Sequence, residues 1–235
     1  PALPAEPKLE RELSEGLLEE EPGRYASGEA DAVSGLLFRG VFPGLDFEEA
    51  SFEGCVFEGM RLTGADLSKT GLTDLVFRRC DLSNASFSKA ALTRVRFDDC
   101  KLVGADFSEG VLRDVRFSRC SLRYAQFFQA GLRSVRFEGC DLSGAAMQEL
   151  KLRDLTLSEC KLAGAELFHT KLAGVDFTTC ETDGLVVAAE DPFDATMIYG
   201  AVNAGLGLSN LPGLNKVGHK RVVAGELLHL PLMQK

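Results

Sequence analysis

The sequence predicts an all-β solenoid in the form of a four-sided β-helix, because its residues repeat with two nested periods. Every fifth residue from Leu37 to Phe177 is Leu or Phe, with Met147 as the single exception. A five-residue period belongs to neither an α-helix nor a flat strand. Cysteines recur at twenty-residue intervals, at Cys80, Cys100, Cys120, Cys140, Cys160 and Cys180. We therefore interpret each pentad as one side of a coil and four pentads as one complete turn.

Each pentad supplies two inward positions, the Leu or Phe and the residue two places before it. The second position is small or apolar, as in the ladder of Ala65, Ala85, Ala105, Ala125, Ala145 and Ala165. Small side chains are expected there because they share a narrow axial space with Phe and Leu at the packing density of a protein interior. With coils about 4.8 Å apart, roughly seven coils would form a rod on the order of 35 Å long.

Individual pentads also resemble the unit of a known family. The segments Ala65–Lys69, Ala105–Glu109 and Cys140–Gly144 resemble the A-(D/N)-L-x-x unit of the pentapeptide repeat proteins. The resemblance covers the whole repeat from Leu37 to Phe177 and implies a right-handed quadrilateral β-helix. It is specific for the fold and weak for function, since most members of the family have no known activity.

The solenoid needs capping at both ends, because open ends expose unpaired strand edges. A leucine stripe predicts a short helix over Glu6–Glu21, which could also be a loosely held arm, and an Asp191-Pro192 start signal predicts a second helix over Pro192–Ala204. We divide the chain into an acidic N-terminal cap or arm (1–36), the pentapeptide-repeat β-helix (37–180), a C-terminal helical cap with the expected dimer element (181–208) and a tail (209–235).

The C-terminal cap is the predicted dimer interface. The second helix presents Phe193, Met197, Ile198 and Val202, which is more apolar surface than the closure of one narrow column requires. In several related pentapeptide proteins the corresponding helix forms a two-fold dimer. The resemblance therefore implies a homodimer through this end.

Charge and hydropathy restrict the cellular setting. The net charge of −9 is concentrated at the N-terminus, where residues 1–36 carry nine acidic and three basic groups. No run of eighteen apolar residues is present, and the first residues lack the basic and then apolar pattern of a signal peptide. We expect a cytoplasmic protein with no membrane contact and no direct binding of nucleic acid.

The sequence offers no catalytic constellation, so we predict that the protein is not an enzyme and uses no cofactor. All seven cysteines fall on the small inward position. Stacked thiols in one column diverge from the tetrahedral arrangement that zinc requires, so no metal site is expected. We interpret the cysteines as small buried hydrophobic residues.

Two surface features are candidate partner sites. Arginines gather at one corner over four coils, at Arg94, Arg96, Arg113, Arg116, Arg133, Arg136 and Arg153. Such a stack could be a face neutralised by salt bridges, or it could bind an anionic partner. Three aromatic residues, Tyr124, Phe128 and Phe168, occupy outward positions and could form a binding patch. Phe128 and Phe168 are two coils apart, so these two could instead be separate rings that lie flat on the rod. Our candidate partner surface comprises Tyr124, Phe128, Phe168, Arg96, Arg116 and Arg136.

These observations favour a non-enzymatic protein-interaction or scaffold module with an unidentified protein partner. The alternative, implied by similarity to the quinolone-resistance branch of the family, is a modulator of DNA gyrase or topoisomerase IV that mimics DNA. A mimic of this length would need on the order of twenty negative charges, whereas residues 37–180 carry twenty acidic and nineteen basic groups. The acidic residues of the first coils are Asp46, Glu48, Glu49, Glu53, Glu58 and Asp66.

Overall fold

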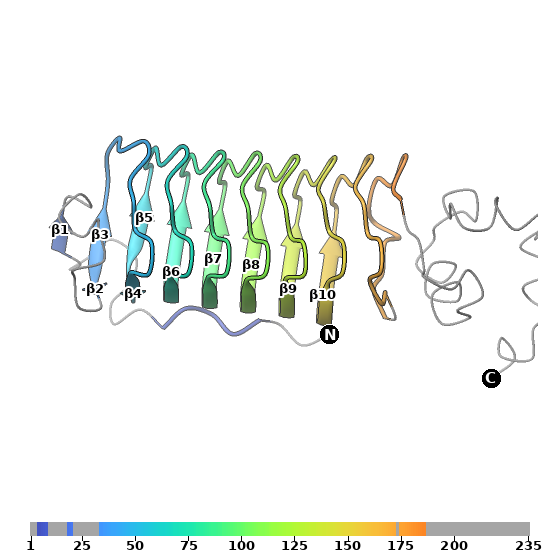
Figure 1. Ribbon diagram of the computed structural model, residues 1–235, viewed down its shortest axis with the longest axis horizontal. Helices are drawn as coiled ribbons and strands as arrows, with labels where there is room; N and C mark the ends of the chain where they lie inside the picture. The colour runs from blue at the N-terminus through green and yellow to red at the C-terminus, as the bar shows by residue number, and fades with distance from the viewer. Residues whose placement is uncertain (1–3, 9–17, 21–32, 173, 187–235) are drawn as a thin grey trace, which may run out of the picture.

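The protein is a straight parallel β-helix (Figure 1). The computed structural model describes residues 4–8, 18–20, 33–172 and 174–186. Within these residues one ten-stranded sheet forms along the rod. Its strands are β1 (Leu18–Glu20), β2 (Val33–Ser34), β3 (Leu36–Phe38), β4 (Ser51–Glu53), β5 (Val56–Glu58), β6 (Gly71–Arg78), β7 (Ala91–Asp98), β8 (Val111–Ser118), β9 (Gly131–Glu138) and β10 (Lys151–Ser158).

The coils stack in a strict twenty-residue register. From β6 to β10 each strand pairs in parallel with the strand twenty residues away, as in Phe97↔Phe117. The other two sides of each coil are joined by single bridges, which extend this register from Val41↔Arg61 to Lys161↔Glu181. The predicted fold class, an all-β quadrilateral β-helix, is confirmed.

The corners of the square are residues in the left-handed backbone region. Positive φ angles recur at every fifth position, for example +56° at Lys69, +57° at Asp74 and +53° at Arg79. Because that region disfavours side chains other than Gly, Asn and Asp, the corners cost conformational energy that the column must offset. The five-residue period of the sequence is therefore the spacing between these corners.

The core is a column of stacked phenylalanine rings. Phe97 and Phe117 lie 4.8 Å apart between ring centroids with a 4° angle between their planes. The neighbouring stack of Phe87 and Phe107 has the same spacing, and rings of the two stacks meet edge to face, as Phe107 and Phe117 do at 5.8 Å. Parallel-displaced and T-shaped contacts are the favoured arrangements of aromatic rings. Each coil thus buries its aromatic side chains against the coils before and after it.

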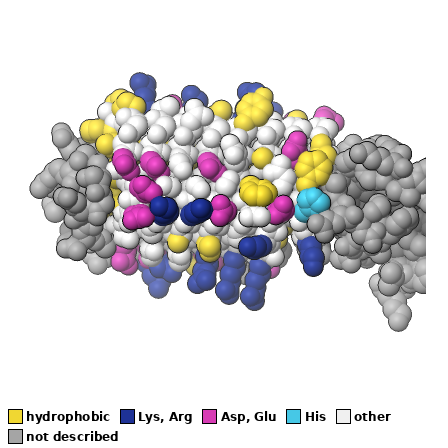
Figure 2. Space-filling view, viewed as in Figure 1, with side chains coloured by type: hydrophobic (Ala, Val, Ile, Leu, Met, Phe, Trp, Pro, Cys, Tyr) yellow, Lys and Arg dark blue, Asp and Glu magenta, His cyan; other side chains and the backbone are white. Residues whose placement is uncertain are grey.

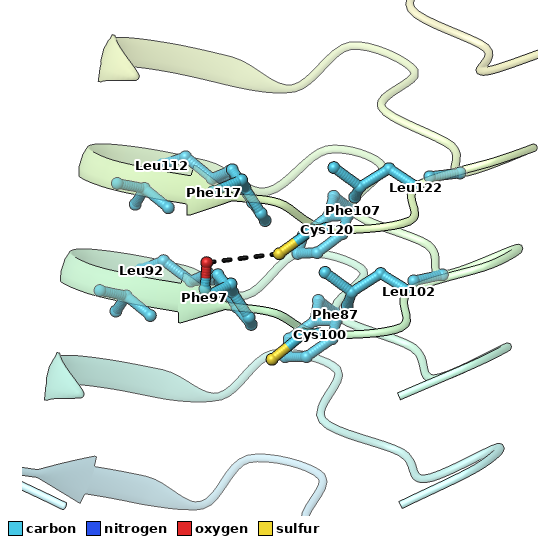
Figure 3. Close-up of a cluster of buried hydrophobic side chains, with 14 of the residues drawn as sticks. Phe87, Leu92, Phe97, Cys100, Leu102, Phe107, Leu112, Phe117, Cys120 and Leu122 are labelled. Carbon is cyan, nitrogen blue, oxygen red and sulfur yellow. Dashed lines mark hydrogen bonds between the residues drawn. The ribbon is translucent and has the colours of Figure 1, made fainter. Parts of the chain in front are cut away.

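The cysteine ladder completes this core and has a polar function as well (Figure 3). The thiol of Cys120 donates hydrogen bonds to the carbonyl oxygens of Phe97, at 3.3 Å, and Ser118, at 3.4 Å. The same two bonds recur at Cys80, Cys100, Cys140 and Cys160. A thiol is as small as the space requires and also supplies a weak donor that alanine lacks.

The first coil departs from the predicted register. Phe38, not Leu37, continues the ring stack, since its centroid lies 4.8 Å from that of Phe57. The pairing Phe38↔Phe57 spans nineteen residues instead of twenty, and Gly40, with a φ of +125°, makes the shortened corner. The prediction that Leu37 starts the inward series is therefore wrong. Leu37 lies on the outward side of β3 and is buried in a small separate cluster with Val56 and Val76.

The N-terminal helix predicted over Glu6–Glu21 is wrong where the structure describes it. Residues 4–8 are not helical, and Leu18–Glu20 forms strand β1, which pairs in parallel with β3. The physical reason is the open edge of β3, because an extended segment can satisfy its backbone groups and a helix cannot. Residues 9–17 lie outside the described residues, as do the predicted helix over Pro192–Ala204 and the tail at 209–235.

Candidate interaction surfaces

The N-terminal arm, which we define as residues 4–8, lies along the outside of strands β6 to β8 (Figure 1). The Glu6 carboxylate contacts the guanidinium groups of Arg96, at 3.2 Å, and Arg116, at 3.3 Å. The arm begins beside β8 and passes β7 to reach β6, so it runs against the direction in which the coils are added. An extended segment of the chain is thus bound to an outer surface of the rod.

Backbone amides of the arm are also held by the rod. The amide of Ala5 donates to the Asp114 carboxylate at 3.3 Å, and the amide of Lys8 donates to the Asp74 carboxylate at 2.8 Å. Asp74 and Asp114 occupy equivalent left-handed corners two coils apart. The arm therefore follows this corner of the β-helix.

Asp74 is the most deeply buried acidic residue of this corner, with 4% exposure. The Arg94 guanidinium binds it through two bonds of 2.6 and 2.7 Å. Burial alone would raise the pKa of Asp74, but Arg94 and the Lys8 amide outweigh burial and hold the pKa below its ordinary value. Asp74 is therefore an anionic anchor for the arm at neutral pH.

Two columns of arginines flank the corner, and we call them together the arginine face. The paired column is Arg96, Arg116 and Arg136, and the open column is Arg113, Arg133 and Arg153. In each column the residues are direct neighbours on adjacent strands. Their backbones are therefore about 4.8 Å apart.

The paired column is largely neutralised by carboxylates. Arg96 contacts Asp98 at 2.7 Å, and Glu138 contacts both Arg116, at 2.7 Å, and Arg136, at 3.0 Å. Burial would raise the pKa of Glu138, but these two guanidinium groups lower it below its ordinary value. For this column the salt-bridged alternative from the sequence describes the structure, and Glu6 of the arm adds a further carboxylate.

The open column has no such partners. Arg113, Arg133 and Arg153 are exposed, and no described carboxylate lies within 4.0 Å of their guanidinium groups. The carboxylate of Asp154, at the corner of β10, likewise forms no hydrogen bond or ion pair with the described residues. The arginine face is therefore saturated on one side of the corner and open on the other.

The aromatic candidates lie elsewhere on the rod. Tyr124 is 58% exposed and Phe128 is 41% exposed, whereas Phe168 is half-buried. Tyr124 is itself a left-handed corner residue, with φ +58°, and this corner is diagonally opposite the corner of Asp114 in the same coil. The six residues predicted as one partner surface therefore form two separate surfaces.

The Tyr124 ring lies flat on the rod. A side chain at Gly144, one coil further, would come within 2.6 Å of this ring. The Arg123 guanidinium lies 5.5 Å from the ring centroid, within the range of a cation–π contact. Tyr124 thus has neighbours within its own surface. Figure 2 shows hydrophobic side chains at several places on the face that it displays, some isolated and some in small groups.

The acidic first coils carry their own counter-charges. Oxygens of Asp46, Glu48 and Asp66 lie within 4.8 Å of one another, close enough to share a cation. The ammonium group of Lys69 already contacts Glu48 at 2.7 Å and Glu49 at 3.2 Å. Figure 2 shows acidic side chains gathered over the N-terminal coils with basic side chains beside them. This end is consequently less negative than its acidic residues alone suggest.

The cysteines are free thiols. All are buried except Cys180, which is half-buried. Burial raises the pKa of Cys55 to about 11, so this thiol stays protonated at neutral pH. The protonated, inward-facing thiol of Cys55 is therefore a poor nucleophile and a poor metal ligand.

The predicted dimer interface lies in a part of the chain that the structure does not describe. The residues proposed for the dimer interface, Phe193, Met197, Ile198 and Val202, lie outside the described residues. The partner surface and the dimer therefore stay predictions. Among the residues that are described, no helix has the length and apolar character needed to span a membrane.

Comparison with solved structures finds proteins of low identity. Full-length QnrB1, a plasmid-mediated fluoroquinolone resistance protein, is 20% identical, covers 79% of this chain and 94% of its own, and has a TM-score of 0.30. Rfr23, a pentapeptide repeat protein from the cyanobacterium Cyanothece, is 18% identical, with coverages of 56% and 86% and a TM-score of 0.29. HetL, a pentapeptide repeat protein involved in heterocyst differentiation regulation in Nostoc, is 16% identical, with coverages of 66% and 86% and a TM-score of 0.17.

Comparison with family models gives a firmer result. No curated protein matches the chain significantly. The model of the pentapeptide repeat region matches residues 71–146, and the model of eight pentapeptide repeats matches residues 42–74 and 140–178. The two models together cover the β-helix from residue 42 to residue 178 without a gap. With its left-handed corners every five residues and its twenty-residue coils, the chain belongs to the pentapeptide repeat family.

Proposed function

We propose that this protein is a non-enzymatic interaction module that binds a protein partner along an outer surface of its β-helix. The observation that supports this proposal is the bound N-terminal arm. Its carboxylate and two backbone amides are held by side chains of three successive coils. A surface that binds one extended polypeptide through both side-chain and backbone groups is suited to bind another.

The rod supplies the rigidity that such binding needs. Its outward side chains are fixed at the strand spacing by the stacked core, so a partner meets preorganised groups and less conformational freedom is lost on binding. The thiols, which are the strongest potential nucleophiles among the described residues, face the core. This arrangement favours binding over catalysis.

Site-specific photocrosslinking in the native host tests the proposal. A photoreactive amino acid would be placed at Arg133 on the arginine face, at Phe128 on the aromatic surface and at the exposed Ala163 as a control. We expect a discrete crosslinked protein from at least one of the first two positions and none from the control. Equal and diffuse crosslinking from all three positions would contradict a dedicated partner surface.

Modulation of DNA gyrase or topoisomerase IV is a second candidate, supported by the acidic side chains of the first coils. The contacts of Lys69 with Glu48 and Glu49 reduce this support. Purified protein would be added to a gyrase supercoiling assay with and without a quinolone. Unchanged supercoiling and unchanged quinolone sensitivity at micromolar protein would remove this candidate, and the interaction module would remain.

A homodimer through the C-terminal end is a further part of the proposal. It is supported by the apolar helical pattern of Phe193, Met197, Ile198 and Val202. Light scattering should give twice the chain mass for the parent protein and a single chain mass for Ile198→Glu. A monomeric parent at high concentration would contradict the dimer. Cytoplasmic localisation likewise stays a prediction.

A further inference from the structure

We propose that the arginine face is a receptor for an extended acidic segment of a partner protein, which binds along the Asp114 corner, engages the open column of Arg113, Arg133 and Arg153, and competes with the N-terminal arm. This inference rests on the proposed interaction function and names its surface and the chemistry of its partner.

The first support is the uncompensated charge of the open column. Three guanidinium groups stack on β8, β9 and β10, and none of them forms an ion pair with a described carboxylate within 4.0 Å. Like charges directly opposite one another on adjacent strands are destabilising. Carboxylates laid along the open column would relieve this repulsion.

The second support is the arm, which shows how an acidic segment binds there. A single carboxylate, that of Glu6, bridges arginines of two successive coils. The arm reaches only the paired column, and only on β7 and β8. The described part of the arm, residues 4–8, supplies no carboxylate to the arginines of β9 and β10.

The third support is a match between two spacings. The arm's amide donors belong to Ala5 and Lys8, three residues apart, which is about 10 Å in an extended chain. Their acceptors, Asp114 and Asp74, lie two coils apart, which is also about 10 Å. Asp154 is the next carboxylate at the same interval, and it accepts no hydrogen bond from the described residues. The corner thus provides a repeating set of acceptors for every third amide of an extended polypeptide.

These acceptors favour a polypeptide over a nucleic acid. Asp114 accepts a backbone amide proton from the arm, and Asp154 can do the same, whereas a phosphodiester backbone has no N–H to donate. The arginines then recognise the acidic side chains, and the aspartates recognise the backbone.

Fluorescence anisotropy on the full chain tests the inference, with a labelled Ala-Glu-Ser repeat peptide as the probe. The Glu6→Gln variant should bind the probe about three-fold more tightly, because its arm competes less well. The triple variant Arg113→Gln, Arg133→Gln, Arg153→Gln should bind about ten-fold more weakly. A matched control, Lys101→Gln, Arg123→Gln, Lys161→Gln, removes the same charge from other sides of the rod and should change binding less than about two-fold.

The Asp154→Asn variant separates specific recognition from bulk charge. It removes a negative charge, so general electrostatics would strengthen binding of an acidic peptide. We expect weaker binding by about three-fold, because a charged acceptor for a peptide amide is lost.

Four results would overturn the inference: equal weakening in the two triple variants, no effect of Glu6→Gln, stronger binding by Asp154→Asn, or tighter binding of a single-stranded oligonucleotide of equal charge. If the probe fails to bind while photocrosslinks form at position 128, the interaction function stands and only this surface assignment is lost.

Discussion

One surface column of the rod alternates in charge, whereas the arginine columns stack like charges. The alternating column contains Arg61, Asp81, Lys101, Ser121, Asp141, Lys161 and Glu181. Its ion pairs form between successive coils, such as Lys101 with Asp81 at 3.5 Å and Lys161 with Glu181 at 3.8 Å. The paired column instead obtains carboxylates from a neighbouring column and from the N-terminal arm.

The difference between the columns shows at which surface positions the β-helix neutralises its own charges. Where charges alternate within a column, the solenoid neutralises itself and needs no other segment. Where like charges repeat, the counter-charge comes from outside the column, and in the open column no described carboxylate supplies it. We propose that repetition of like charge is the feature that distinguishes a binding surface from a solvated face of this β-helix.

The largest expected effect is a loss of stability in the core, which we compare with a substitution at the neighbouring position on the arginine face. Phe117→Ala should destabilise the protein by about 3–5 kcal/mol, because it leaves a cavity in the ring stack. Arg116→Ala should cost about 1 kcal/mol, since its ion pairs are partly exposed. Chemical denaturation measures both. Equal losses would mean that the assignment of inward and outward positions fails.

The next effect concerns the buried anchor of the arm. Arg94→Ala should cost about 2 kcal/mol, because it leaves the Asp74 carboxylate without its guanidinium partner. Arg119→Ala is the matched control, because Arg119 makes a similar pair with Asp99 at an exposed site, and it should cost less than Arg94→Ala. Thermal unfolding distinguishes the two variants. An equal loss in both would contradict a special status for the Asp74 corner.

Acid stability tests the same anchor. The folded-state pKa values of Asp74 and Glu138 are depressed below their ordinary values of 3.8 and 4.5. Their stabilisation is therefore complete above those values and is lost as the pH falls through the folded-state pKa values. We expect the unfolding temperature to stay level between about pH 7 and pH 5 and to fall below about pH 4. The unfolding temperature of the Asp74→Asn variant should fall less than that of the parent below about pH 4. A fall that begins above pH 5 would contradict the assignment of this acid sensitivity to the Asp74 and Glu138 ion pairs.

The smallest expected effect is the change in stability when one charge is reversed in the open column or in the alternating column. Arg133→Glu converts the open column to alternating charge and should stabilise the protein by about 0.5 kcal/mol. Lys161→Glu converts an alternating column to like charges and should destabilise it by a similar amount. Opposite signs in urea denaturation would support the comparison. A loss of stability in both variants would show that the open arginines are already compensated.

The sequence was sufficient for the β-helix because one rule, an inward residue every five positions, repeats through all central coils. It failed at the first coil, where Leu37 and Phe38 are both apolar and only the ring of Phe57 decides between them. It also failed at β1, because Leu9, Leu13 and Leu17 suggested a helix while the open edge of β3 favours a strand. Tertiary contacts overrode local pattern in both places.

The candidate site was predicted only where it follows the repeat of the sequence. The stacked arginines follow directly from the twenty-residue period. The arm could not be found this way, because Glu6 is one of nine acidic residues in residues 1–36 and lies ninety positions from Arg96. A contact between a non-repeating segment and a repeating surface leaves no periodic signal. The stack of like charges was the one available indication that a counter-charge should be sought.

The central claim is that the arginine face holds an acidic extended segment, and the position of the arm tests it most directly. Spin labels at Ala5→Cys and Ser134→Cys would report the distance between the arm and β9 by electron paramagnetic resonance, with the half-buried Cys180 replaced by Ser and the other native thiols buried. We predict a single short distance in the parent at low salt, and a broad, longer distribution in Glu6→Gln and at about 1 M salt, where charges are screened beyond about 3 Å. A broad distribution in the parent, or a narrow one that persists without Glu6, would contradict the account.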